Sequence, residues 1–285
     1  AAPAKALSPS TFNNATAELP SGGGVFHMRP QGMHEIVFGL AQPERAGVRQ
    51  WGPSISQRRE KPVMEAHQKQ ITVHAQHAES APVIYLPVVM GDGSDVYDRC
   101  RELDCPPFAL VAIGGLDWNR ELSPWGCDGT VRDAEPFGGQ ASGFLDELLN
   151  WIIPEAESSL PQPPTWRGIA GYSLAGLFAL WSLWQTDAFS RAASASGSLW
   201  FPDFVDRAST ALFAGNPQAV YLSLGQKMET KTPNRMMRHV LDDTRAMEKL
   251  LVEVVIPTTL ELNPGNHFAQ TDLRMARGIH WILTH

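Results

Sequence analysis

From residue 82 onward, strand-like and helix-like patterns alternate, and this alternation is the feature that most narrows the fold. Two near-continuous apolar runs, PVIYLPVVM (82–90) and FALVAIGG (108–115), are typical of strands buried on both faces. Further strands are expected within 165–171, 219–225 and 251–262. Strands separated by helices in this way predict a mostly parallel, doubly wound sheet with helices on both faces.

Helical patterns occupy the intervals between these strands. The expected helices cover 94–105, 142–153, 174–184, 235–251 and 272–285. Pro154 is expected to end the second of them, because proline cannot donate the next backbone hydrogen bond. The third, LAGLFALWSLW, is apolar nearly all round and is expected to be buried.

The first part of the chain differs from the rest in composition and in the pattern of its apolar residues. Residues 1–24 are rich in Ala, Pro, Ser and Gly and predict a flexible lead, whereas residues 25–285 predict a single domain. Three short runs, VFHMR, EIVFGLA and ITVHAQ, predict antiparallel strands at the entry to the sheet. The expected fold class is therefore α/β, with antiparallel N-terminal strands added to a parallel core.

Composition and charge exclude several classes of function. The net charge is −7 without a long basic run, which argues against nucleic acid as a partner. No stretch approaches the roughly 18 apolar residues that a membrane-spanning helix needs. The three cysteines form neither a disulfide framework nor a zinc-like spacing with histidines, so neither a metal nor a cofactor is expected.

The chain begins with Ala1 rather than methionine, as a processed or trimmed product would. A cytoplasmic location is expected, with the periplasm or secretion after removal of a signal peptide as the alternative. No feature of the sequence specifies an oligomeric state.

The stretch GIAGYSLAGL (168–177) follows an expected strand and opens an expected helix. It resembles the nucleophile-elbow pattern G-x-S-x-G, in which a serine sits on a strained strand-to-helix turn. Gly171 and Ser173 fit the pattern, but Ala175 stands at the second glycine position. On this motif alone, Ser173 is either a nucleophile or the N-cap of a core helix.

The other parts of a serine-dependent site are sought at the carboxyl ends of the strands, in the order serine, acid, histidine. His267 alone among the nine histidines lies at such a strand end in that order. Glu229 follows the strand at 219–225 and is the candidate acid, with a solvated loop glutamate as the alternative. The backbone N–H groups of Leu174 and Gly115 are the candidate oxyanion donors, although Gly115 also suits a plain turn.

Several segments of the chain together resemble a known family. They are GIAGYSLAGLFALW, FSRAASASGSLWFPDF, LSLGQKMETKTPN, NPGNHF and RMARGIHWIL. They are similar, from about residue 82 to the end, to the putative-esterase family of α/β-hydrolases, which includes esterase D and the ferric-siderophore trilactone esterases. The resemblance implies a serine esterase in which Ser173 is the nucleophile, His267 the base and Glu229 the acid, with Leu174 and Gly115 forming the oxyanion hole.

The sequence departs from the family pattern at three positions. Ala175 replaces the usual glycine, Gly115 stands where siderophore-type members often have tyrosine, and Pro87 interrupts a strand. These differences bear on the siderophore substrate more than on the hydrolase chemistry.

Substrate-binding residues are expected near the same strand ends. Trp118, Trp125 and Trp200 predict an aromatic cleft for an apolar or aryl ester, or else structural packing. Arg120 is expected either to bind an anionic group or to pair with a neighbouring carboxylate. The expected partner is a small-molecule ester, possible substrates including a siderophore-like lactone. Two rival functions remain: a mycolyltransferase-like acyltransferase with the same triad, and a non-catalytic binding protein with a hydrolase fold.

Overall fold

The computed structural model describes residues 69–75, 81–130, 134–226, 234 and 236–285. All of them belong to one compact unit, Arg45–His285. The lead expected at 1–24 and the strands expected before residue 42 lie outside the described part of the chain. The predicted flexible lead and these predicted N-terminal strands are therefore not tested by the structure.

A seven-stranded sheet forms the centre of this unit, in the order β1-β3-β2-β6-β7-β8-β9. The edge strand β1 pairs antiparallel with β3, and the remaining pairs are parallel. The strands are β1 Gln70–Ala75, β2 Val83–Pro87, β3 Ala109–Gly114, β6 Arg167–Tyr172, β7 Arg191–Ala195, β8 Ala219–Gly225 and β9 Thr258–Asn263. The predicted mostly parallel α/β class with an antiparallel strand near the N-terminal side is confirmed.

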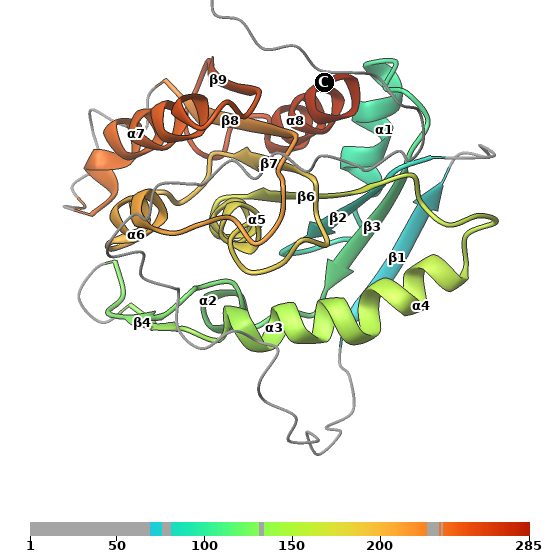
Figure 1. Cartoon of the computed structure of the whole chain (residues 1–285), viewed down its shortest axis with the longest axis horizontal. Helices are drawn as coiled ribbons and strands as arrows, with labels where there is room; N and C mark the ends of the chain where they lie inside the picture. The colour runs from blue at the N-terminus through green and yellow to red at the C-terminus, as the bar shows by residue number, and fades with distance from the viewer. Residues whose placement is uncertain (1–68, 76–80, 131–133, 227–233, 235) are drawn as a thin grey trace, which may run out of the picture. The chain divides into compact units, whose positions relative to one another are not determined.

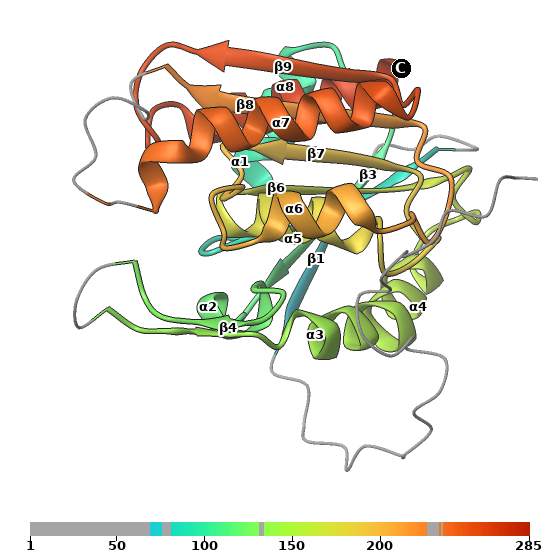
Figure 2. The same ribbon diagram turned by 60° about the vertical axis from the view of Figure 1, so that its left-hand side comes forward.

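Helices cover both faces of the sheet (Figures 1 and 2). The helices α1 (Ser94–Glu102) and α8 (Thr271–Thr284) pack against one another and bury one face. The opposite face is covered by four further elements: α3 (Ala141–Glu147) with its continuation, α5 (Leu174–Ser182), α6 (Phe204–Thr210) and α7 (Val240–Glu253). Adjacent residues of the central strands alternate between the two cores, as the pleat requires.

Strand β7 consists mainly of alanine and serine, and glycines of two helices approach it from opposite sides. A side chain at Gly176 of α5 would come 2.8 Å from Ser194 Oγ. A side chain at Gly278 of α8 would come 2.8 Å from Tyr221 Cδ1 and 3.2 Å from the Ala193 side chain. Small residues on the strand and on both helices therefore permit a close helix–sheet–helix stack.

The helix expected to end at Pro154 continues through it. The α-helix α3 passes into a π-helical turn, Leu148–Ile152, and then into α4 (Ile153–Ser158), with Pro154 in the first turn of α4. The wider π turn accommodates a residue that cannot donate to the carbonyl four positions earlier. The prediction that Pro154 ends the helix was wrong.

Two other predicted boundaries also differ. The segment expected to be a strand from 251 begins only at Thr258, because α7 extends to Glu253. Strand β7 was not predicted as a strand, since alanine and serine have weak strand propensity. In the described part of the chain, no helix is both long and apolar enough to cross a membrane.

Candidate active site

Ser173 lies between β6 and α5, at the carboxyl end of the sheet. Its backbone has φ 57° and ψ −118°, a conformation that is uncommon for any residue except glycine. Hydrogen bonds hold this turn on both sides: Ser173 N donates to Ala195 O at 3.0 Å, and Ser198 N donates to Ser173 O at 3.0 Å. Such strained turns persist only where their surroundings fix them, and they cluster at functional sites.

The flanking small residues have separate roles in this turn. A side chain at Gly171 would collide with the backbone carbonyl of Ala175, so glycine is required there. Ala175 itself is fully buried in α5, and its methyl group is accommodated. The departure from G-x-S-x-G at residue 175 thus leaves the turn intact.

His267 lies in the loop between β9 and α8, and its Nε2 atom is 3.0 Å from Ser173 Oγ. The two residues that the sequence singled out, 94 positions apart, are therefore within hydrogen-bond reach. Burial, together with the positive charge of Arg274, lowers the pKa of His267 to about 4. The imidazole is neutral at pH 7 and can accept a proton from the serine.

Two residues that the sequence analysis did not single out hold the histidine loop. Tyr172 donates from its hydroxyl to His267 O at 2.6 Å. Arg274 is buried; its guanidinium donates to Asn266 O at 3.1 Å and to the hydroxyl of Ser196, and lies 5.5 Å from the centre of the Tyr172 ring. A signal for Arg274 existed, because it shares one helical face with Gly278 and Ile282, which the i, i+4 pattern places in the core.

The candidate acid Glu229 lies outside the described residues, so its role stays a prediction. The candidate oxyanion donors are both at strand ends. Leu174 is the first residue of α5, where free N–H groups favour negative charge. Gly115 directly follows β3 with φ +73°, a left-handed conformation that suits glycine.

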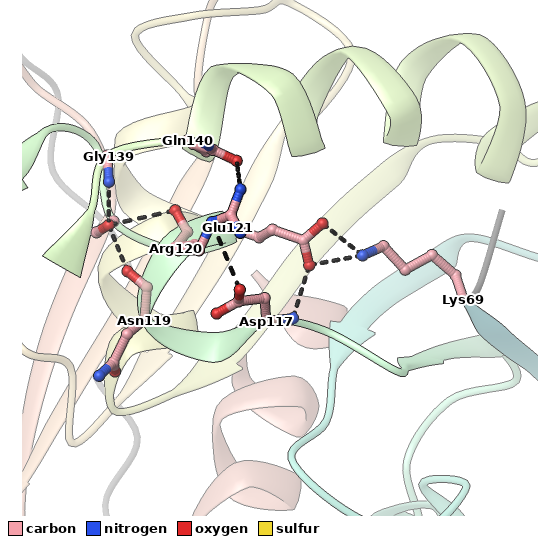
Figure 3. A network of polar contacts seen from close by, with 8 residues as sticks. Lys69, Asp117, Asn119, Arg120, Glu121, Gly139 and Gln140 are labelled. Atoms are coloured by element: carbon pink, nitrogen blue, oxygen red, sulfur yellow. Dashed lines mark hydrogen bonds and ion pairs between the residues drawn. The ribbon is translucent and has the colours of Figure 1, made fainter. Parts of the chain in front are cut away.

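A network of polar contacts fixes the segment after β3 (Figure 3). Lys69 Nζ contacts both carboxylate oxygens of Glu121 at 2.5 Å, and Glu121 Oε2 accepts from Asp117 N at 2.8 Å. Ser123 Oγ donates to Asn119 O at 2.6 Å and accepts from Gly139 N at 2.8 Å. These contacts hold the short helix α2 (Trp118–Glu121) in place.

A cavity of about 220 Å³ opens beside Ser173. Its lining is mainly apolar and includes Trp118, Phe137, Leu174, Trp200 and Met237. Polar groups come from Asn119, Thr130, Glu135, Ser173 and Ser198. Two of the three predicted tryptophans thus lie where an aromatic cleft was expected.

Trp125 and Arg120 are not among the residues that line this cavity. The ring of Trp125 packs edge-on against Phe201 and under the guanidinium of Arg207. Arg120 lies 3.5 Å from Asp117 and donates to Gln140 Oε1 at 2.9 Å. Of the two roles predicted for Arg120, binding an anionic group or pairing with a neighbouring carboxylate, the geometry favours the second.

Seven of the lining residues were not predicted from the sequence: Asn119, Thr130, Ala134, Glu135, Phe137, Ser198 and Met237. Phe137 belongs to β5 (Phe137–Gly138), which pairs with β4 (Gly126–Cys127), and such two-residue strands leave no periodic signal. Met237 lies just before α7, within the helix expected at 235–251. Glu135 carried no sequence signal. The described residues contain no cluster of three or more His, Cys, Asp or Glu side chains suited to a metal ion.

Comparisons with known proteins agree with this architecture. The family model "Esterase", described as putative esterase, matches residues 89–250, more than half of the chain. The uncharacterized protein YbbA of Bacillus subtilis (strain 168) is 27% identical over 183 residues, which are 60% of this chain and 71% of that protein.

Solved structures show the same fold. An IroE-like serine hydrolase from Shewanella oneidensis has a TM-score of 0.62 at 19% identity and covers 76% of both chains. The siderophore hydrolase EstA from Aspergillus nidulans has a TM-score of 0.59 at 19% identity over 76% of this chain and 90% of its own. The fold and the site thus define an enzyme of the α/β-hydrolase type. Within that class, the chain belongs to the esterase family, and its chemistry is ester hydrolysis.

Proposed function

We propose that this esterase hydrolyses carboxylic esters through an acyl-enzyme intermediate on Ser173, with His267 as the general base. The observation that carries the proposal is the 3.0 Å contact between Ser173 Oγ and His267 Nε2, made on a strained turn at the start of a buried helix. A serine is a weak nucleophile unless a neighbouring base takes its proton, and this contact supplies the base.

The reaction follows in two steps. Ser173 Oγ attacks the ester carbonyl while His267 accepts its proton, and the imidazolium then protonates the departing alcohol. Water attacks the acyl-enzyme with His267 again acting as base, which frees the acid and restores the serine. We assign oxyanion stabilisation to the N–H groups of Leu174 and Gly115, and orientation of the imidazole to Glu229.

We further propose that the acyl group is apolar or aromatic and of modest size. Trp118, Trp200, Phe137 and Met237 offer mainly apolar surface, and a cavity of about 220 Å³ has room for an aryl or medium-chain acyl group. A siderophore-like lactone is the second candidate substrate, because the structural neighbour EstA is named as a siderophore hydrolase.

A fluorophosphonate probe tests the nucleophile. The probe should label the wild-type chain and fail to label Ser173→Ala, whose kcat/KM for a p-nitrophenyl ester should fall by at least about 10⁴-fold. Ser198→Ala is the matched control, because its hydroxyl lies 3.4 Å from Ser173 Oγ in the same cavity; it should keep the label. Labelling of Ser173→Ala, or no labelling of the wild type, would reject the serine mechanism.

A graded series of p-nitrophenyl esters, run beside a trilactone siderophore, tests the substrate class. We expect the highest kcat/KM with aryl or medium-chain esters, and Trp118→Ala should move the preference towards longer chains. Trp125→Ala should leave the preference unchanged, since that ring does not line the cavity. A marked preference for the trilactone would favour the second candidate.

The same assay separates hydrolase from acyltransferase. A competing alcohol acceptor is added, and the products are identified by mass spectrometry. The free acid should remain the main product. Predominant transfer to the alcohol would support the acyltransferase alternative.

A further inference from the structure

We propose that Cys100 and Cys105 form an oxidant-sensitive thiol pair, in which a hydroperoxide oxidises Cys105 and Cys100 then closes a disulfide. Cys100 lies in the last turn of α1 and Cys105 just beyond the end of that helix, and both contact the apolar core beneath α1 and α8. Figure 1 shows these two helices on the same face of the sheet. None of the residues that line the cavity at Ser173 belongs to it. The proposal is therefore independent of the proposed ester hydrolysis.

The backbone brings the two cysteines together. Helix α1 ends in a turn in which Cys105 N donates to Cys100 O at 3.0 Å and Asp104 N donates to Arg101 O at 3.1 Å. Asp104 adopts φ 53°, which completes a Schellman motif. In this motif the side chains of the first and last residues meet, and here both are cysteines. The single hydrogen bond between their backbones keeps the two Cα atoms within about 7 Å, which is the reach of a disulfide.

The surroundings give the two thiols different roles. Cys105 is half-buried, and its Sγ lies 3.5 Å from Nδ1 of His280 on α8. A hydrogen bond from the Cys100 thiol, and then the contact with His280, lowers the pKa of Cys105, although its partial burial and, less strongly, Asp104 oppose this. Cys100 is fully buried, and both this hydrogen bond and its burial raise its pKa. The negative charge is thus placed on the accessible sulfur and the proton on the buried one.

The chemistry balances with hydroperoxide as the two-electron oxidant. The Cys105 thiolate attacks the peroxide, which gives a sulfenic acid and releases hydroxide, or an alkoxide from an organic peroxide. The Cys100 sulfur then attacks the sulfenic sulfur as its proton leaves with the hydroxyl group. A disulfide forms and water departs. A dithiol reductant reverses the bond.

The third cysteine provides an internal reference. Cys127 is half-buried like Cys105, but burial, and then Asp128, raise its pKa. At pH 7 we expect iodoacetamide to alkylate Cys105 at least about tenfold faster than Cys127 in the full folded chain. His280→Gln should slow alkylation of Cys105 and leave the rate at Cys127 unchanged. Equal rates at Cys105 and Cys127 in the wild type would overturn the assignment.

Peptide mapping by mass spectrometry tests the disulfide. After treatment with hydrogen peroxide, the wild type should yield peptides linked through Cys100 and Cys105, while Cys127 remains alkylatable. Cys100→Ser should instead accumulate a dimedone-reactive sulfenic acid at Cys105, and Cys105→Ser should form no disulfide. Absence of the linked peptides from the wild type, with Cys105 intact or converted to sulfinic acid, would overturn the proposal.

Discussion

The hydroxyl of Tyr172 donates a 2.6 Å hydrogen bond to the backbone carbonyl of His267. Tyr172 also directly precedes Ser173 in the chain. One residue therefore ties the turn that carries the serine to the loop that carries the histidine, across 95 positions of sequence. The spacing of the candidate pair depends on this contact as well as on the loop's own conformation.

Replacing Tyr172 with phenylalanine tests this connection. Tyr172→Phe should lower kcat roughly tenfold with little change in KM, because small displacements of reacting groups are costly. The unfolding free energy should fall by about 1 kcal/mol for one lost hydrogen bond. Tyr97→Phe is the control, since the buried Tyr97 hydroxyl has no hydrogen-bond partner in the described structure. Equal effects of both substitutions would contradict the connection.

The lowered pKa of His267 predicts an unusual pH profile. The base works only when neutral, so kcat/KM should be flat at neutral pH and fall as the pH drops through a value near 4. Arg274→Met should move this acidic limb to higher pH because it removes a positive charge, whereas Arg274→Lys should keep it near the wild-type position. Initial rates measured from pH 3.5 to 8 are the readout, and a wild-type limb near the ordinary histidine value of about 6.5 would refute the prediction.

Adding a methyl group at Gly171 and removing one at Ala175 should have different effects on stability and activity. Gly171→Ala should lower the unfolding free energy by about 3 kcal/mol or more and abolish activity, because the new side chain meets the carbonyl of Ala175. Ala175→Gly should cost only about 1 kcal/mol through helix propensity and keep most activity. Urea unfolding and kcat/KM measure both. Similar stability of the two variants would show that the turn is less constrained than its geometry indicates.

The contact between Lys69 and Glu121 should be worth more than a surface ion pair. The side chains are only 8% and 20% exposed, so Lys69→Met leaves a largely buried carboxylate without its cation and should cost about 3 kcal/mol. Lys69→Met with Glu121→Gln should recover part of this loss, because glutamine can still accept from Asp117 N. Lys249→Met breaks an exposed pair with Glu253 and should cost less than about 1 kcal/mol. Equal costs for Lys69→Met and Lys249→Met in chemical unfolding would be the contrary result.

Much of the architecture could be predicted because it depends on local pattern and chain order. Buried parallel strands read as continuous apolar runs, and their carboxyl ends meet at one edge of the sheet. This rule, with the order serine, acid, histidine along the chain, predicts the pairing of Ser173 with His267 from the sequence. The tolerance of Ala175 followed from its size alone.

What could not be predicted depends on tertiary contacts. The π turn that carries the helix past Pro154 has no sequence signature at that position. Strand β7 is alanine-rich because helices approach it closely on both faces, which a propensity scale does not register. Phe137 and Met237 reach the cavity only through the packing of segments distant in sequence.

The close stack around β7 couples the core to the chemistry. Helix α5 begins at the residue after Ser173, helix α8 begins four residues after His267, and each presents a glycine to opposite sides of β7. The size of the side chains in β7 therefore sets the distance between the two helices. A larger side chain in β7, or in place of either helix glycine, would push the helices apart. It would thereby displace Ser173 relative to His267 although it touches no substrate. Selection for catalysis would then also limit the size of the side chains in β7 and at the two helix glycines, which lie in the core.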